Sequence, residues 1–171
     1  KEKFDMGKFD EIILINLGGG NRWQYKKWTK EGYAGLINML STKYRKSGIA
    51  IIAGDEDRVF FEEILSLSAK NDNLINFGCD NSTEDFICLV SLADKVFTSD
   101  SLCFHIAAAL DKYTVVITGP TSHTELDVFS NGVILYSAKV DCLSCYLNTC
   151  DKTVTCMNTV TPEEIMKLIE A

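Results

Sequence analysis

Residues 98–121, TSDSLCFHIAAALDKYTVVITGPT, constrain the fold of this chain more than any other segment. An apparent strand runs into the polar turn Asp100-Ser101, a helix of small residues follows, and a second strand over 114–118 ends at a Gly-Pro-Thr turn. Backbone N–H groups at such a helix start can face an anion where two strands end beside it. The segment therefore predicts a parallel sheet with a site for a nucleotide-type ligand.

Strand and helix patterns alternate along the rest of the sequence. The predicted strands are Glu11–Leu17, Ile49–Ala53, Leu74–Phe77, Lys95–Thr98, Thr114–Thr118 and Val133–Tyr136. The first predicted helix covers Glu31–Lys46, with Thr29 as its cap and Gly48 as its stop. Further helices are predicted over Arg58–Ala69, from Ser82 onwards, over Cys103–Leu110 and from Thr161 to Ile169. Repeated strand–helix units predict an α/β fold, a doubly wound, mostly parallel Rossmann-like sheet.

Length and charge limit the class of protein. A chain of 171 residues is expected to form one domain, residues 1–171. Its net charge of −7 disfavours nucleic-acid binding. No apolar run approaches the roughly 20 residues that cross a bilayer, so no membrane span is expected. The N-terminus lacks the apolar core of a signal peptide and starts at Lys1, so we expect a processed or excised piece in a reducing compartment.

Unusual loops follow four of the predicted strands. They read NLGGGNRW, GDED, TSDSLCFH and GPTSHTE, after the first, second, fourth and fifth strands. The carboxyl ends of parallel strands meet at one edge of a sheet, where ligands bind. Because all four unusual loops follow strand ends, the sequence predicts a ligand site at that edge of the sheet. The triple glycine fits neither the Walker A nor the GxGxxG spacing, and a flexible turn is the alternative interpretation.

Charged residues in these loops allow two interpretations each. Arg22, Lys26 and Lys27 form the best basic spot for an anion, but lysines ahead of a helix can also be simply solvated. The acidic run 55–57 can bond ribose hydroxyls or cap the next helix.

The turn before the predicted helix at residue 103 has the same two interpretations. Asp100 and Ser101 are good helix caps, and capping is compatible with phosphate binding by the neighbouring N–H groups. His105 is either a packed side chain or part of the site.

Seven cysteines are many for this length. Four of them, with spacing C-x2-C-x4-C-x5-C, lie in a Cys-rich segment over 141–159: Cys142, Cys145, Cys150 and Cys156. They suggest a structural zinc or iron–sulfur site, and reduced thiols or disulfides are the alternatives. The other three are expected to be small core residues: Cys79, Cys88 and Cys103.

Taken in order, these motifs resemble glycosyltransferase family 9, whose best-known members are the lipopolysaccharide ADP-heptose heptosyltransferases. The resemblance covers nearly the whole chain. The matching segments are the strand and glycine loop at 12–20, the Lys-x-Trp at 26–28, GDED at 54–57, residues 91–110, ITGPT at 117–121 and the cysteine tail through Met157.

The resemblance implies the C-terminal, donor-binding half of a two-domain GT-B enzyme. It places Lys26 on the donor phosphates, Asp100, Ser101 and Leu102 in the diphosphate turn, His105 below it, and Glu56 on the ribose. It also places Gly119, Pro120 and Thr121 along the same cleft. The family usually has Gly where this chain has Leu102, a side chain that crowds the approach to the turn.

The resemblance also implies what lies outside this chain. The acceptor site and the catalytic base belong to the missing N-terminal domain, so no catalytic residue is expected here. The implied partners are a nucleotide-diphospho-sugar, with an ADP-sugar favoured, and a glycan or lipid-linked acceptor. The implied location is cytoplasmic, at the inner membrane face through the parent protein, with no required cofactor. The alternatives are a metal- or redox-responsive module and another nucleotide-sugar enzyme such as an epimerase.

Overall fold

One sheet of six parallel strands organises the computed structural model, which describes residues 4–20 and 22–170. The strands are β1 (Glu11–Asn16), β2 (Ser47–Ile52), β3 (Leu74–Gly78), β4 (Lys95–Ser99), β5 (Tyr113–Thr118) and β6 (Gly132–Tyr136). Their order across the sheet is β3-β2-β1-β4-β5-β6, and every neighbouring pair is parallel. The predicted doubly wound, Rossmann-like sheet is confirmed.

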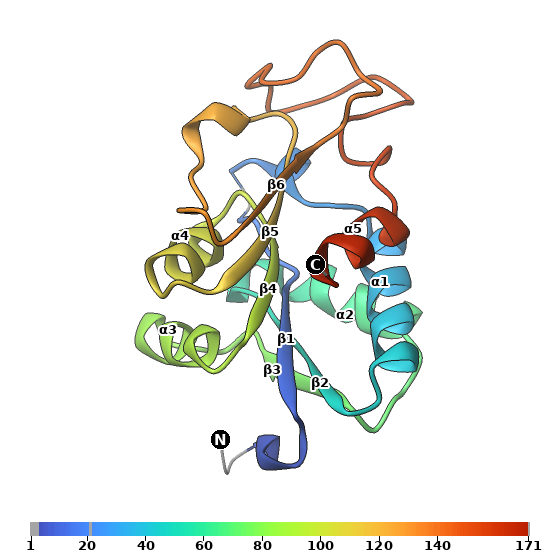
Figure 1. Cartoon of the computed structure of the whole chain (residues 1–171). Coiled ribbons are helices and arrows are strands. Elements are labelled where there is room, and N and C mark those ends of the chain that lie inside the picture. Colours follow the sequence, from blue (N-terminus) through green and yellow to red (C-terminus); the bar gives the residue numbers. More distant parts are fainter. Residues whose placement is uncertain (1–3, 21, 171) are drawn as a thin grey trace.

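Helices cover both faces of this sheet (Figure 1). On one face lie α1 (Lys30–Lys43), α2 (Arg58–Leu67) and α5 (Pro162–Ile169), and on the other lie α3 (Thr83–Ser91) and α4 (Leu102–Ala109). Two separate apolar clusters, one on each face, form the core.

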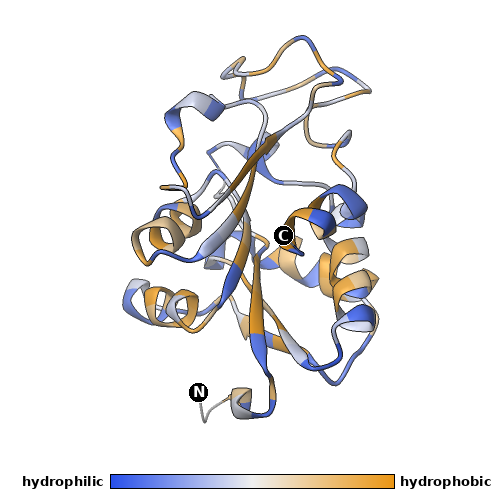
Figure 2. Ribbon diagram, in the orientation of Figure 1, coloured by the Kyte–Doolittle hydropathy of each residue, from blue (hydrophilic) through white to orange (hydrophobic). Residues whose placement is uncertain are grey.

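The apolar strand runs exist because both faces of the sheet are covered. In β1, Ile13 and Ile15 pack in the cluster with α1, α2 and α5, while Ile12 and Leu14 pack in the cluster on the opposite face. Successive side chains of a strand point to opposite faces, so a strand covered on both sides needs apolar residues throughout. Figure 2 shows the resulting hydrophobic strands in the interior.

Capping residues set the helix starts. Thr29 accepts the Gly32 N–H at the start of α1, and Thr161 with Glu164 forms a full capping box on α5. The predicted stop of α1 at Gly48 is wrong. The helix ends at Lys43, and Gly48 lies inside β2, where a Cβ would stand 2.7 Å from the Ile12 and Ile75 side chains.

The cysteines lie both in the core and at the surface, and the long connection between β6 and α5 has no regular structure. Cys79 and Cys103 are buried, but Cys88 is exposed on α3, so its predicted place in the core is wrong. Residues 137–161, all of them described, form turns and bends without a helix or strand. Among the described residues, no helix combines the length and the apolar character needed to cross a membrane.

Candidate functional site

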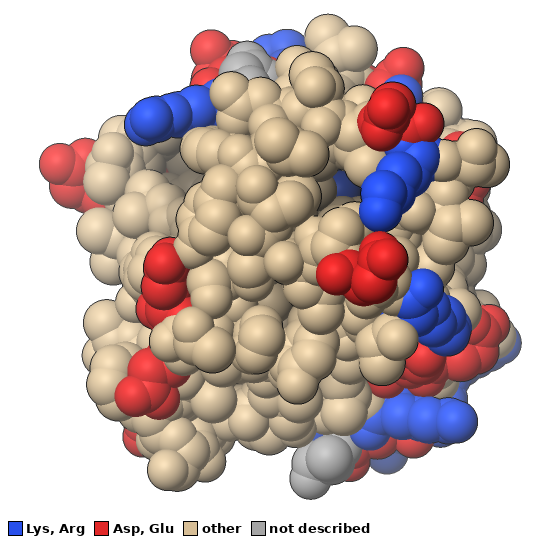
Figure 3. Space-filling model, turned by 90° about the horizontal axis from the view of Figure 1, so that it is seen from above, with Lys and Arg blue, Asp and Glu red and all other residues tan. Residues whose placement is uncertain are grey.

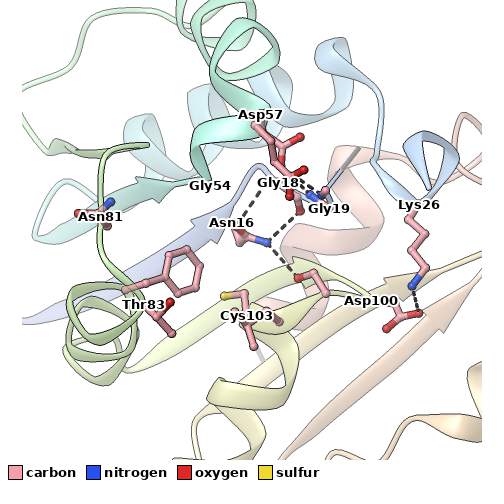
Figure 4. Close-up of a pocket in the computed structure, with 15 residues that line it drawn as sticks. Asn16, Gly18, Gly19, Lys26, Gly54, Asp57, Asn81, Thr83, Asp100 and Cys103 are labelled. Atoms are coloured by element: carbon pink, nitrogen blue, oxygen red, sulfur yellow. Dashed lines mark hydrogen bonds and ion pairs between the residues drawn. The ribbon is translucent and has the colours of Figure 1, made fainter. Parts of the chain in front are cut away.

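The order of the strands reverses between β1 and β4. From β1 the chain continues outward to β2 and β3, and from β4 it continues the other way to β5 and β6. The loops that follow β1 and β4 therefore diverge and leave a crevice at the carboxyl ends of the strands, the usual ligand position in such sheets. A pocket of about 370 Å³ lies there (Figure 4).

Five segments of the chain line this pocket. They are Asn16 with the glycine loop Gly18–Gly20; Lys26; Gly54, Glu56 and Asp57; Asn81, Thr83 and Phe86; and residues 100–103. The loops after β1, β2 and β4 thus meet at the pocket, whereas the fourth predicted loop, after β5, does not line it. The loop after β3, with Asn81 and Thr83, joins them, although its sequence carries no glycine run or charge cluster that marks a site.

Asn16 ties the ends of β1 and β4 together. Its buried side-chain amide donates to the Gly18 carbonyl at 3.0 Å, to Thr98 Oγ1 at 3.0 Å and to Ser101 Oγ at 3.2 Å. The amide thus fixes the glycine loop relative to the turn before α4. In the sequence, the only signal for Asn16 is a polar residue near the end of an apolar strand.

Lys26 and Asp100 form the charged pair of the pocket. Lys26 Nζ lies 2.8 Å from Asp100 Oδ2, and the same oxygen accepts the Thr121 hydroxyl at 2.6 Å. The two charged side chains are 17% and 13% exposed. In Figure 4 the Lys26 side chain points toward Asp100, and both residues line the pocket.

The first turn of α4 is not capped by a side chain. Ser101 occupies the cap position, but its hydroxyl accepts from Asn16 instead of from the helix. The first N–H groups of a helix have no intrahelical partner. Leu102 and Cys103, which supply two of these groups, line the pocket. This arrangement can receive an anion at a helix N-terminus.

The glycine loop is held by Asp57 and Lys27. Asp57 Oδ2 accepts the N–H groups of Gly19 and Gly20 at 3.1 and 3.2 Å, and Oδ1 forms an ion pair with Lys27. Gly20 has φ of 74°, which favours glycine. Lys27 is therefore not a solvated lysine, and the Asp57 side chain makes no cap bond to α2.

Of the remaining predicted site residues, Glu56 lines the pocket, whereas His105, Gly119 and Pro120 do not. Glu56 is exposed and lines its rim. His105 is exposed outside the lining, with its ring 5.0 Å from Phe104. Gly119 and Pro120 are buried against the cysteine-rich segment, where their carbonyls accept backbone N–H groups of that segment at 2.9 and 2.8 Å.

The four clustered cysteines share a second, smaller pocket. Cys142, Cys145, Cys150 and Cys156 line about 70 Å³ together with Tyr25 and Pro120, among others. Burial, and then the nearby thiols of Cys145 and Cys142, raise the pKa of the Cys156 thiol.

The cysteine cluster has the right ligand type for zinc or iron. Within the described part of the chain, however, no three Cys, His, Asp or Glu side chains are arranged so that they could hold a metal ion. The thiols are gathered without the convergence that a tetrahedral site needs, so we assign no chemistry to a metal there.

The fold is a doubly wound α/β domain with a pocket at the point where the strand order reverses. Comparison with known proteins gives the family. The model of glycosyltransferase family 9 (heptosyltransferase) matches residues 1–155, and the chain belongs to this family.

Similar proteins are heptosyltransferases. Lipopolysaccharide heptosyltransferase 1 of Campylobacter coli is 25% identical over 174 residues, covering 99% of this chain and 48% of that protein. The Escherichia coli ADP-heptose lipopolysaccharide heptosyltransferase II superposes with a TM-score of 0.74 at 17% identity, over 94% of this chain and 45% of the other.

A third relative was solved with a donor. The dodecameric, iron-containing heptosyltransferase TibC of enterotoxigenic E. coli, in complex with ADP-D-beta-D-heptose, has a TM-score of 0.68 and 14% identity, over 94% of this chain and 44% of TibC. The chain thus spans about half the length of the relatives that it matches.

Proposed function

We propose that this chain is the nucleotide-diphospho-sugar binding domain of a glycosyltransferase that resembles the heptosyltransferases of bacterial surface-glycan synthesis. The observation that carries the proposal is the pocket at the switch point, where Lys26, the glycine loop and the uncapped start of α4 face one space. A cation and free N–H groups are the partners that a diphosphate needs.

The proposed contacts follow the geometry. The diphosphate lies between Lys26 and the turn formed by Asp100, Ser101 and Leu102, and Thr121 supports this turn through its bond to Asp100. In this proposal, Glu56, which lines the pocket, bonds the ribose hydroxyls. His105, Gly119 and Pro120 lie outside the lining of the pocket, so we assign them no contact with the donor.

The role of the domain in the reaction is electrostatic. In sugar transfer, an acceptor hydroxyl attacks the anomeric carbon, its proton passes to a base, and the nucleoside diphosphate leaves. Lys26 and the N–H groups of α4 stabilise the negative charge of that leaving group. The base and the acceptor site belong to a further domain, and the acceptor is a glycan or a lipid-linked sugar at the inner face of the membrane.

An ADP-sugar is the donor that we favour, since ADP-heptose appears in the name of one relative and in the complex of another. Leu102, 60% exposed at the pocket, narrows the space beside the diphosphate turn. We expect this side chain to limit which sugar the donor carries.

Titration of the 171-residue chain with ADP, UDP and GDP tests the proposal. Calorimetry should show weak binding, tightest for ADP, and NMR shifts should cluster on Lys26 and residues 100–105. No response to any of the three at millimolar concentration, in protein with a cooperative thermal transition, would refute the proposed site. Acidic side chains are interspersed among the basic ones on the face seen from above in Figure 3. We therefore expect specific contacts in the pocket, and not the overall surface charge, to determine nucleotide binding.

A further inference from the structure

Two consecutive lysines bind carboxylates on opposite sides of the crevice. Lys26 pairs with Asp100 in the turn after β4, and Lys27 pairs with Asp57 at the start of α2. We infer that Lys27 is a positioning residue: it neutralises the carboxylate that holds the glycine loop, and so makes the pocket acceptable to a diphosphate. The inference rests on the proposed function, because it concerns the same pocket.

Burial makes the Lys27–Asp57 pair different from a surface ion pair. The side chains are 9% and 3% exposed, whereas those of the surface pair Lys30–Glu63 are 38% and 47% exposed. Exposed pairs contribute little, but a buried charge that loses its partner is strongly unfavourable. Lys27 also lies 5.4 Å from the centre of the Phe60 ring, which further fixes its position.

Asp57 cannot turn away from the pocket without releasing the loop. Its Oδ2 accepts the N–H groups of both Gly19 and Gly20, and a Cβ on Gly18 would stand 2.6 Å from the same oxygen. The carboxylate therefore stays at the pocket wall whether or not a ligand is present, and its charge must be balanced in place.

The charge of Asp57 matters for a diphosphate because the pocket is already rich in carboxylates. Among the described residues, the pocket lining carries one cation, Lys26, and three carboxylates, on Glu56, Asp57 and Asp100. A nucleoside diphosphate is itself negative, so an unbalanced Asp57 would repel it across a partly desolvated space. Lys27, outside the lining, balances the charge of Asp57, so Lys26, which already pairs with Asp100, does not also have to offset Asp57.

Lys27 also helps to place Lys26. The two residues share the end of the 3-10 turn Gln24–Lys26, and the next residue, Trp28, is buried and donates its indole N–H to the Val160 carbonyl at 3.1 Å. The segment is thus held at two consecutive residues, by the Lys27–Asp57 ion pair and by the bond from Trp28 to Val160. Both anchors limit the positions that Lys26 can reach.

Calorimetric titration of ADP into variants of the 171-residue chain tests the inference. Lys27→Met, which keeps most of the aliphatic stem, should weaken ADP binding about tenfold, equal to about 1.4 kcal/mol. Lys27→Arg should restore most of the affinity. The double variant Lys27→Met/Asp57→Asn should bind within about threefold of the unmodified chain, because the carboxylate charge is gone too.

Each alternative gives a different pattern. If Lys27 touches the ligand itself, the double variant stays as weak as Lys27→Met; if it only stabilises the fold, Lys27→Met lowers the melting temperature but folded protein binds normally. Either result overturns the inference. Should Lys27→Met not fold, the double variant provides the test. Binding of ADP within about threefold of the unmodified chain then supports the inference, and weaker binding contradicts it. Failure of the unmodified chain to bind ADP would instead contradict the proposed function. The matched control is Lys30→Met, which should leave ADP binding unchanged because Lys30 lies outside the pocket lining.

Discussion

Lys26 is the cation of the pocket, and its environment separates function from stability. The side chain leaves a short 3-10 turn and reaches Asp100 across the crevice, with little core packing of its own. In the longer parent enzyme, we expect Lys26→Ala to lower kcat by about 100-fold or more, since it removes a group that stabilises the leaving diphosphate. The melting temperature should change by only a few degrees.

Steady-state kinetics with a nucleotide-sugar donor measure this effect. Lys30→Ala is the control, because Lys30 forms an ion pair with Glu63 at the surface, away from the pocket lining. Unchanged kcat and KM in Lys26→Ala would remove this lysine from the site.

The thiols should differ sharply in reactivity. Burial raises the pKa of Cys103 to about 12 and that of Cys79 to about 11, whereas Cys88 and Cys145 are exposed. Only a thiolate reacts quickly with iodoacetamide, so at pH 8 we expect labelling of the two exposed thiols and protection of the two buried ones.

Peptide mass spectrometry after timed labelling checks this order. In urea all seven cysteines should react, which controls for reagent and digestion. If Cys103 reacted in the folded protein as fast as Cys88, its burial beside the pocket would be wrong.

Among the elements of the fold, the cysteine-rich segment between β6 and α5 has no regular secondary structure and packs on the end of β5. Its residues Ser144 and Tyr146 bond the carbonyls of Gly119 and Pro120, and a Cβ at Gly119 would collide with the Cys156 sulfur. A segment with this little core of its own depends on such contacts for order.

Cys145→Ser should therefore act on stability and not on chemistry. In the parent enzyme we expect a melting temperature lowered by roughly 2–4 °C, about 1 kcal/mol, with unchanged turnover per folded molecule. A loss of activity without loss of stability would place the cluster in the active site. Metal analysis of anaerobically purified protein tests the zinc hypothesis separately, and stoichiometric metal would support it.

Local signals in the sequence predicted most elements to within a few residues. The capping threonines 29 and 161 accept the expected N–H groups, and apolar runs became strands because the sheet is covered on both faces. Gly48 shows the limit of such signals. Glycine often ends a helix, but this one lies in β2 because neighbouring side chains leave no room for a Cβ.

At the scale of the whole molecule, the chain forms one side of a cleft enzyme in our proposal. We expect the purified 171-residue chain to bind ADP weakly and to transfer no sugar, because the acceptor site and base lie on the further domain. A radiolabelled donor assay with acceptor present measures this. Turnover above the rate without protein would refute the division of roles, and the assembled parent enzyme is the positive control.

The sequence by itself determined the order of strands and helices, the parallel sheet and the edge at which its loops meet, since these depend on periodicity and on turn residues close along the chain. The further side chains that join the predicted ones in the pocket, and the contacts that hold them, depend on the tertiary structure. Asn16 forms a hydrogen bond with Thr98, 82 residues further along the chain, and Lys27 forms an ion pair with Asp57. Pro120 lines a pocket with residues of the cysteine-rich segment. Such contacts depend on how strands lie side by side, and no short-range pattern encodes the distance between them.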